Sequence, residues 1–338
     1  MKRILYIGPY SEVGGVSIHV RRLSQLVSDN YNVEIIDESK LIFNDGVIYN
    51  LRSGRVVKYF QLILTSNIIH IHTSINWLRL IHVLLSKILF KEVILTIHSL
   101  THITSKNNFF LLKLASRCAD KVICVNNIIK NKLGKSSYIV IPAYLPPILH
   151  EENDLPEELQ IILDINKNRK IIVSNAYRLV LFNGQDLYGF DLLIEVARKI
   201  KVKKDNFKII LIVSSLENNN ELLSNYTNML IKEKLENQIS ILPYSISFVK
   251  LIQRSDMVVR ATNTDGDSLT IRESIFLNKP VIASDVIERP KGTILFKNRD
   301  SNDLYTKILE NINKQKKPAM SSNLEYKKFY LNLYNNNK

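Results

Sequence analysis

The chain has 338 residues, 46% of them hydrophobic and 23% charged, which is too apolar for a disordered protein and long enough for two domains. Lysine and arginine number 46 against 32 aspartates and glutamates, so the net charge is +14. Residues 1–150 hold 18 basic and 8 acidic side chains, so most of the excess lies in the first half. We expect an anionic partner: a nucleic acid, a phosphorylated ligand or a membrane surface.

The cysteines and the apolar runs narrow the class of protein further. Cys118 and Cys124 are too few for a disulfide framework and lack the neighbours of a structural zinc site, which favours a reducing cytoplasm. The first residues predict a strand and a glycine turn instead of a signal peptide. No window reaches the ~18 uninterrupted apolar residues of a spanning helix. The protein is therefore expected to be soluble or peripheral.

Short apolar runs alternate with longer amphipathic stretches along almost the whole chain, which predicts βαβ units and parallel sheets. The runs of the first half are residues 3–8, 32–36, 68–72, 93–97, 122–125 and 138–141. Those of the second half are residues 170–174, 208–213, 239–242, 257–259, 280–283 and 294–296. This pattern predicts two doubly wound domains.

A proline- and acid-rich passage separates the two series and predicts a hinge. We expect a first domain over residues 1–150, a linker over residues 151–169 and a second domain over residues 170–320. Residues 321–338 carry aromatic side chains at helical spacing, which predicts a C-terminal amphipathic helix.

The turn after the first strand carries Gly14 and Gly15, and the helix that follows would present free N–H groups to a phosphate. Asp37 follows the second strand, as in a dinucleotide-binding fold, but the glycine spacing does not fit G-x-G-x-x-G. A tight turn without a ligand explains these residues equally well. The periodicity of the helix places Val20 toward the core and Arg22 toward solvent.

All seven histidines lie at or before His150. His70 and His72 alternate along one predicted strand, which would suit a metal pair, but no third ligand stands at a suitable spacing. Histidines satisfied within the core are the simpler explanation. His98 directly follows the strand 93–97, at the edge where parallel sheets bind ligands, so it is a candidate functional residue.

Residues 260–285 are the most informative passage, because a loop rich in Asp, Thr and Gly follows a strand and precedes a helix. Asp265 in the loop and Glu273 in the helix are expected to border one pocket. Carboxylates placed in this way accept hydrogen bonds from sugar hydroxyls, and Arg260 or Arg272 would neutralise a phosphate. A turn, a helix cap and a solvated helix face are the alternative explanation.

Together these pieces resemble the family 4 glycosyltransferases, which are retaining nucleotide-sugar enzymes of the GT-B fold. The resemblance covers nearly the whole chain in order, with the glycine turn and residues 68–73, 96–98, 119–125, 141–142 and 260–284. The family has two acidic residues with seven residues between them, the spacing of Asp265 and Glu273, with Asp in place of the usual first Glu. The implied α/β fold has two Rossmann-like doubly wound domains facing a cleft, with a C-terminal helix.

The resemblance also implies roles for individual residues. His98 would contact the transferred sugar, Asp265 would approach the sugar hydroxyls, and Glu273 would accept a hydrogen bond from the nucleotide ribose. These three are the expected catalytic residues. The expected donor-binding residues are Gly14, Gly15, Arg178, Arg260, Gly266, Asp267, Ser268, Leu269, Thr270, Arg272 and Glu273.

One position departs from the family pattern. The family holds the leaving diphosphate with an arginine and a lysine at the start of the second domain. Arg178 matches the arginine, but Tyr188 stands where the lysine is expected. Arg260 and Arg272 would supply the missing charge. We expect no metal, because helix N-termini and arginines stabilise the diphosphate and the Asp-Gly-Asp sequence at residues 265–267 would serve for hydrogen bonds.

The implied reaction moves a sugar from a nucleoside diphosphate, UDP or GDP, to a glycan or polyprenyl-linked acceptor, without a cofactor. A weaker similarity to one subgroup points to capsule and exopolysaccharide assembly. The basic first domain would face the acceptor and an anionic surface at the inner face of the cell membrane. Candidate membrane contacts are Trp77, Arg79 and Phe90 in residues 77–91, with residues 107–117, although ordinary helices covering the sheet explain both segments as well.

Two other classes stay open. A sugar-nucleotide epimerase of the same fold would explain both domains, but it would convert the donor with no acceptor present. A nucleic-acid-binding protein would explain the charge. The sequence has no helix-turn-helix, aromatic ribonucleoprotein motif or basic arm, so nucleic acid is not expected as a partner.

Overall fold

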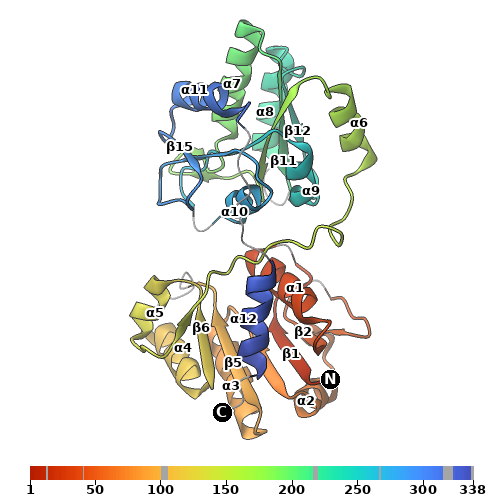
Figure 1. Ribbon diagram of the computed structural model, residues 1–338, viewed down its shortest axis with the longest axis vertical. Coiled ribbons are helices and arrows are strands. Elements are labelled where there is room, and N and C mark those ends of the chain that lie inside the picture. Colours follow the sequence, from red (N-terminus) through yellow and green to blue (C-terminus); the bar gives the residue numbers. More distant parts are fainter. Residues whose placement is uncertain are drawn as a thin grey trace. The chain divides into compact units, whose positions relative to one another are not determined.

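The computed structural model describes residues 1–12, 14–40, 42–99, 106–215, 220–265, 268–314 and 323–335. The chain divides into two compact units, Met1–Pro146 with Ser322–Lys338, and Pro147–Ser321. Each unit is a parallel sheet with helices on its faces (Figure 1). The predicted fold class, two Rossmann-like α/β domains with a C-terminal helix, is therefore confirmed.

The described residues of the first unit form seven strands and the helices around them. The strands are β1 (Arg3–Gly8), β2 (Asn32–Asp37), β3 (Ile48–Asn50), β4 (Ile68–Ile71), β5 (Glu92–Ile97), β6 (Lys121–Cys124) and β7 (Ile139–Val140). The helices are α1 (Gly15–Val27), the short 3-10 helix η1 (Leu51–Ser53), α2 (Val56–Thr65), α3 (Asn76–Ile88), α4 (Lys106–Cys118), α5 (Asn127–Leu133) and α12 (Asn323–Asn335). All strands pair in parallel, in the order β3-β2-β1-β4-β5-β6-β7.

The strands of this sheet are apolar on both faces because helices cover both faces. Side chains alternate along β1, so Leu5 and Ile7 pack with α2 and α3 while Ile4 and Tyr6 pack with α1 and α12. Helix α12 comes from the far end of the sequence and lies beside α1 (Figure 1). Its Tyr334 hydroxyl lies 3.0 Å from the hydroxyl of Tyr6, which fixes the helix on the sheet.

The second unit repeats the same plan. Its strands are β8 (Lys170–Ala176), β9 (Leu181–Phe182), β10 (Gln185–Asp186), β11 (Phe207–Val213), β12 (Ile239–Leu242), β13 (Met257–Arg260), β14 (Val281–Ser284) and β15 (Ile294–Phe296). Its helices are α6 (Glu157–Ile165), α7 (Phe190–Lys203), α8 (Asn220–Lys232), α9 (Phe248–Arg254), α10 (Leu269–Phe276) and α11 (Ser301–Asn311). Six strands form a parallel sheet in the order β12-β11-β8-β13-β14-β15, and β9 and β10 form an antiparallel hairpin.

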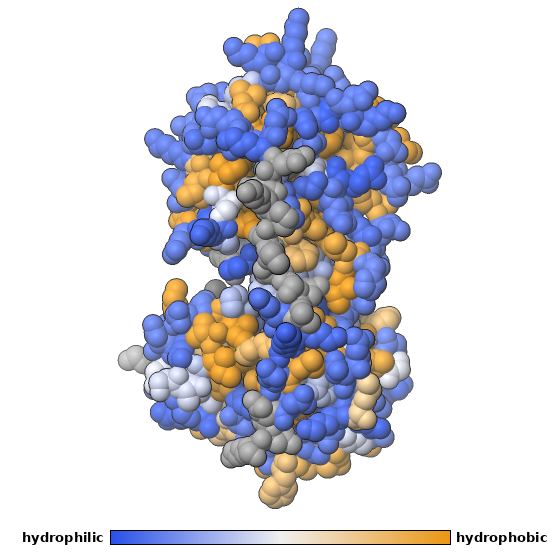
Figure 2. Space-filling model, in the orientation of Figure 1, coloured by the Kyte–Doolittle hydropathy of each residue, from blue (hydrophilic) through white to orange (hydrophobic). Residues whose placement is uncertain are grey.

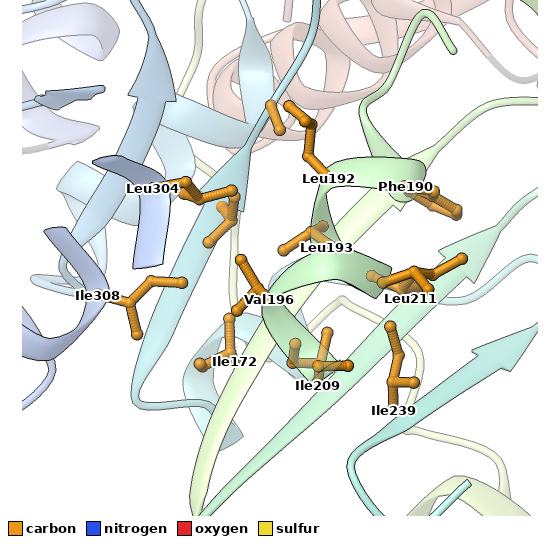
Figure 3. Packing of buried hydrophobic residues seen from close by; sticks show 14 of the residues in the cluster. Ile172, Phe190, Leu192, Leu193, Val196, Ile209, Leu211, Ile239, Leu304 and Ile308 are labelled. Carbon is orange, nitrogen blue, oxygen red and sulfur yellow. The ribbon is translucent and has the colours of Figure 1, made fainter. Parts of the chain in front are cut away.

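Helix α7 packs its apolar face onto the second sheet (Figure 3). Its Phe190, Leu193 and Val196 are fully buried with Ile209 of β11 and Leu304 of α11. Burial of each such side chain contributes roughly 1.5–3 kcal/mol relative to exposure, so this cluster is a main source of stability in the second unit.

Each sheet has one point where the strand order reverses. In the first unit the chain builds outward from β1 to β3 and then returns to β4 on the other side; in the second it returns from β12 to β13 beside β8. Open α/β sheets bind ligands at the carboxyl ends of the strands that flank such a point. The ends of β1 and β4, and of β8 and β13, are therefore the places to examine for a site.

Arg22 was expected to face solvent and Arg79 to contact a membrane. Both side chains are buried, so both expectations are wrong. Arg22 is 7% exposed and donates to the carbonyl oxygen of Leu145, because a later segment of the chain covers that face of α1. Arg79 is 3% exposed and donates through Nε to the carbonyl oxygen of Thr73. Its guanidinium is therefore occupied within the fold.

The predicted linker contains regular structure. Residues 157–165 form α6, and its Leu159 and Leu163 are buried in the core of the second unit.

Among the helices that the structure describes, none combines the length and hydrophobicity that crossing a membrane requires.

Candidate functional site

The turn between β1 and α1 is held in place by Asp37, the last residue of β2, and by Ser39, two residues later. Asp37 Oδ1 accepts a hydrogen bond from the Tyr10 N–H at 2.8 Å, and its Oδ2 accepts one from the Ser11 N–H at 3.2 Å. The Ser39 hydroxyl oxygen accepts from the N–H groups of Ser11 and Glu12. Asp37 therefore shapes the glycine turn, which gives it a structural role in place of a ribose contact.

The glycines of this turn leave open space beside the backbone. A Cβ built at Gly14 or Gly15 would have no atom within 4 Å among the described residues, so internal packing does not require glycine at either position. At Gly8 the situation is the opposite, because a Cβ there would lie 3.0 Å from the Cβ of His72. The ends of β1 and β4 thus approach closely, and the turn above them has room for a ligand.

Three histidines from three different elements meet at this edge. His19 comes from α1, His72 follows β4 and His98 follows β5, and one ring nitrogen of each lies within 4.8 Å of the other two. His72 Nδ1 and His98 Nε2 share a hydrogen bond of 3.0 Å. The sequence showed no third ligand beside His72 because these residues are close only in the folded sheet. Their nitrogens could hold a divalent metal such as Zn²⁺.

Burial keeps these imidazoles neutral. It lowers the pKa of His19 to about 4, although a hydrogen bond to the Ala143 carbonyl oxygen opposes the shift. It also lowers the pKa of His72 and of His98 well below the usual value, with help from the neighbouring imidazoles. His19 Nδ1 must donate to that carbonyl, so its Nε2 carries a lone pair. The Nε2 atoms of His19 and His72 have no hydrogen-bond partner among the residues that the structure describes. Both nitrogens are buried as well as unpaired in this part of the chain.

His70 differs from its neighbours because both of its ring nitrogens are occupied. Nδ1 lies 2.8 Å from the Tyr334 hydroxyl, and Nε2 lies 2.8 Å from the Thr96 hydroxyl. It is a satisfied core histidine and ties α12 to the sheet.

We expect the first unit to lose stability as the pH falls from 6.5 toward 4. The unfolded chain binds protons on His19, His70, His72 and His98 near pH 6.5, whereas burial in the folded state lowers all four pKa values. The free energy of unfolding is therefore constant above that pH and decreases below it, by about 2 kcal/mol at pH 5 for His19 alone. Urea titrations at pH 7.5 and 5, followed by the fluorescence of Trp77, measure this, because the single tryptophan lies in the first unit. An unchanged midpoint would contradict the burial of these neutral imidazoles.

In the second unit, Asp265 lies between two arginines. Arg260 Nε and Arg289 Nη1 donate to its Oδ2 at 3.1 and 2.8 Å, and Thr262 Oγ1 donates to the same oxygen. Burial alone would raise the pKa of Asp265, but the two guanidinium groups outweigh it and hold the pKa below its usual value. One carboxylate and two cations leave this group with net positive charge, which suits a diphosphate better than a sugar hydroxyl.

Arg289 was absent from the predicted site because no motif marks it and it lies 24 residues after Asp265. Its side chain is 2% exposed, and it also donates to the carbonyl and hydroxyl oxygens of Ser284. It therefore joins the ends of β13 and β14.

We expect Arg289→Met to lower the free energy of unfolding of the second unit by about 3 kcal/mol, because the buried Asp265 carboxylate loses one of its two cations. Arg260 remains, so the effect should lie at the lower end of the range for a broken buried ion pair. Scanning calorimetry measures it, and Lys291→Met, which removes an exposed cation from the same loop, is the control. Equal stability of the two variants would show that Arg260 alone balances the carboxylate.

The N-terminus of α10 lies at the same edge. Ser268 is its N-cap, but its hydroxyl makes no cap hydrogen bond and has no partner among the described residues although it is buried. Thr270 Oγ1 donates to the side-chain oxygen of Asn175 at the end of β8. Leu269 begins the helix. The first turn of α10 therefore presents N–H groups and a buried hydroxyl next to the strand ends.

The other residues that the sequence predicted for the donor site differ in their exposure. Glu273 is 6% exposed in α10, and Arg272 precedes it and is partly buried. Arg178 follows β8 and is exposed, with no ion pair to it within the described ranges. Gly266 and Asp267 lie outside the described residues.

The position of the missing lysine is filled by an aromatic ring. The Arg260 guanidinium lies 5.0 Å from the ring centre of Tyr188, so a cation contacts the residue that stands where a lysine was expected. The N-terminus of α7 beside it is already capped, because the buried Asp186 carboxylate accepts from the N–H groups of Tyr188, Gly189 and Phe190. A Cβ at Gly189 would lie 2.3 Å from the Ala261 oxygen, so only glycine fits there.

A family model described as "Glycosyl transferases group 1" matches residues 178–314, which include Arg178, the arginine-held Asp265 and helix α10. Most of the second unit therefore matches the group 1 glycosyltransferases, which supports glycosyltransferase activity. A full-length relative, an uncharacterized glycosyltransferase of Methanocaldococcus jannaschii, is 25% identical over 90% of this chain and 87% of the relative. The poly(ribitol-phosphate) alpha-N-acetylglucosaminyltransferase of Staphylococcus aureus is 29% identical over 130 residues, 36% of this chain and 25% of that enzyme.

Solved glycosyltransferases of the GT-B fold have the same architecture. Anabaena HepE in complex with UDP-glucose aligns with a TM-score of 0.63 and 16% identity over 93% of this chain and 90% of HepE. A mutant of Staphylococcus aureus TarM, in complex with UDP among other ligands, aligns with a TM-score of 0.63 and 13% identity over 99% of this chain and all of the other. At this level of identity the likeness concerns the fold, and it gives this glycosyltransferase the GT-B fold.

Proposed function

We propose that this glycosyltransferase is a retaining, metal-independent enzyme of family 4 that takes a sugar from a nucleoside diphosphate bound to its second unit. The main support is the cationic edge at the ends of β8 and β13: Arg178 follows β8 and is exposed, and the buried Ser268 hydroxyl at the start of α10 has no hydrogen-bond partner among the described residues. The two solved structures described above are complexes with UDP-glucose and with UDP, which supports UDP as the donor nucleotide, with GDP as the other expectation.

Departure of the diphosphate creates negative charge, and the second unit provides fixed positive charge to stabilise it. The N–H groups of Leu269 and Thr270 lie at the positive end of the α10 dipole, and the Ser268 hydroxyl can donate beside them. Arg178 is the exposed cation, while Arg260 acts from its place on Tyr188. Arg272 and residues 265–267 complete the proposed diphosphate contacts.

The sugar and the ribose are assigned to other side chains. Glu273 accepts a hydrogen bond from the ribose, and His98 contacts the transferred sugar. Neutral imidazoles support this assignment for His98, because they accept and donate hydrogen bonds to sugar hydroxyls without introducing charge. Gly14 and Gly15 leave room for the donor beside the backbone.

The acceptor is proposed to be a glycan or a polyprenyl-linked sugar of a surface polysaccharide such as capsule or exopolysaccharide. The name of the Staphylococcus aureus relative, a transferase to poly(ribitol-phosphate), supports a phosphate-bearing acceptor. The excess of basic side chains in the first half supports a cytoplasmic enzyme peripheral to an anionic membrane. Trp77 and Phe90 are 55% and 96% exposed and remain candidate contacts.

The anomeric configuration of the product tests the proposal. The purified chain is supplied with UDP-glucose, UDP-N-acetylglucosamine or GDP-mannose and with extracted polyprenyl-linked acceptors, and the product is examined by proton NMR. An α-linked product from an α-configured donor is expected. A β-linked product would contradict retention, and conversion of the donor to an epimer without acceptor would identify the chain as an epimerase.

A further inference from the structure

A pocket of about 260 Å³ lies between α2 and α3 of the first unit, and its lining includes neither the three clustered histidines (His19, His72 and His98) nor the glycine turn. Its lining is almost wholly apolar and includes Leu51, Val56, Phe60, Leu78, Ile81 and Leu85. Sites for drug-sized ligands start at roughly 300 Å³, so this pocket suits part of an elongated apolar ligand better than a whole compact one.

The pocket opens to solvent among exposed apolar side chains. Val56 is 63% exposed and Ile81 is 42% exposed, and neighbours on the same helices, Val57 and Leu84, are 83% and 40% exposed. Hydrophobic side chains at the surface are seen on each unit, among mostly hydrophilic ones (Figure 2). Apolar side chains arranged around an apolar pocket point to a hydrophobic ligand.

The segment that contributes most of the pocket lining is basic. Residues 46–91 contain no aspartate or glutamate. Arg52, Arg55 and Lys58 each adjoin a lining residue in the sequence, and their side chains are exposed and form no ion pair with any described residue. The ligand should therefore carry an anionic group next to its apolar part.

A hydrogen-bonded path runs from the pocket to the carboxyl edge of the sheet. The hydroxyl of Tyr59 lies 2.7 Å from His82 Nδ1, and both residues line the pocket. His82 Nε2 lies 2.9 Å from Glu38 Oε1, which also accepts from the Thr73 hydroxyl. Thr73 directly follows His72. The pocket is thus adjacent to the edge where the first unit is proposed to bind sugar hydroxyls.

We propose that the α2–α3 pocket holds part of the hydrocarbon chain of a polyprenyl phosphate-linked acceptor, whose phosphate is attracted by Arg52, Arg55 and Lys58. An apolar cavity of this size with unpaired cations beside it matches the two halves of such a molecule, an alkyl chain and a phosphate ester. The inference rests on the proposed function, because it names the lipid that presents the acceptor hydroxyl.

Calorimetric titration of the full chain with farnesyl phosphate, below its micelle concentration, tests the inference. Ile81→Trp fills the pocket, and Leu84→Trp adds the same ring at a similarly exposed position of α3 outside the lining. We expect binding to wild type and to Leu84→Trp, and at least tenfold weaker binding to Ile81→Trp. Equal affinity in the two variants, or no binding to wild type, would overturn the pocket assignment.

Titrations with farnesol, inorganic phosphate and phosphatidylglycerol vesicles distinguish binding through the alkyl chain, the phosphate and a membrane surface, and a titration with UDP tests the donor site separately. Farnesol and inorganic phosphate are each expected to bind at least tenfold more weakly than farnesyl phosphate, because each supplies half of the ligand. Binding of phosphatidylglycerol vesicles without binding of farnesyl phosphate would assign this face to a membrane surface and contradict the pocket. UDP should bind all three proteins equally. If wild type binds farnesyl phosphate but does not bind UDP, the proposed donor site is contradicted and the pocket assignment is unaffected.

Discussion

Replacement of His98 by alanine is expected to reduce the rate of sugar transfer by well over tenfold. His98 directly follows β5, and its Nε2 shares a hydrogen bond with His72 Nδ1 beside the turn that leaves space for a ligand. Loss of a hydrogen bond that orients or stabilises the sugar in the transition state lowers kcat and kcat/KM together. Initial rates over a range of donor concentrations measure both constants.

A matched histidine separates this effect from the general effect of removing an imidazole. His150 has a side chain that is 83% exposed, so His150→Ala should transfer sugar at the wild-type rate. Thermal unfolding of both variants checks that the first unit remains folded, since His72 loses its partner in His98→Ala. Full activity of a folded His98→Ala variant would remove His98 from the mechanism.

Glu273→Gln is expected to weaken nucleoside diphosphate binding by about tenfold to a hundredfold. A hydrogen bond to a charged group contributes about 1.5–3 kcal/mol, and each 1.4 kcal/mol corresponds to a factor of ten. The substitution keeps the size of a side chain that is 6% exposed in α10, so the packing of the helix is preserved. Calorimetric titration with UDP and GDP measures the change.

The ribose assignment has its own control. Glu288→Gln removes the same charge from an exposed position of the second unit and should leave affinity unchanged. The 2′,3′-dideoxy form of the nucleotide that binds should bind wild type and Glu273→Gln equally, because it lacks the hydroxyls that Glu273 is proposed to contact. A weakening of equal size with the dideoxy nucleotide would show that Glu273 acts elsewhere.

The alternation of apolar runs was sufficient to predict the fold class. Strands of parallel sheets are apolar on both faces, and the bounds of β12, residues 239–242, agree with the sequence prediction. The three-residue strand β3 and the two-residue strands of the β9–β10 hairpin were not predicted, because polar residues and glycine interrupt the apolar pattern around them.

Contacts between distant segments explain what the sequence could not predict at the site. His98 and Glu273 were found from their positions after a strand and in a motif. His19 and Arg289 carry no local signal and reach the site only because helix α1 and the segment after β14 lie beside the strand ends. The sequence also presented Asp265 as an open carboxylate, whereas two arginines occupy its oxygens.

The second unit is proposed to bind a nucleoside diphosphate at the ends of β8 and β13, and thermal unfolding with UDP or GDP measures this binding. A ligand at 100 times its dissociation constant stabilises the folded state by about 2.7 kcal/mol. For a unit of this size that corresponds to a rise in Tm of about 5–10 °C. We predict this rise for at least one of the two nucleotides in wild type, and a much smaller one in Arg178→Ala. No rise with either nucleotide, or an equal rise in Arg178→Ala, would contradict the account.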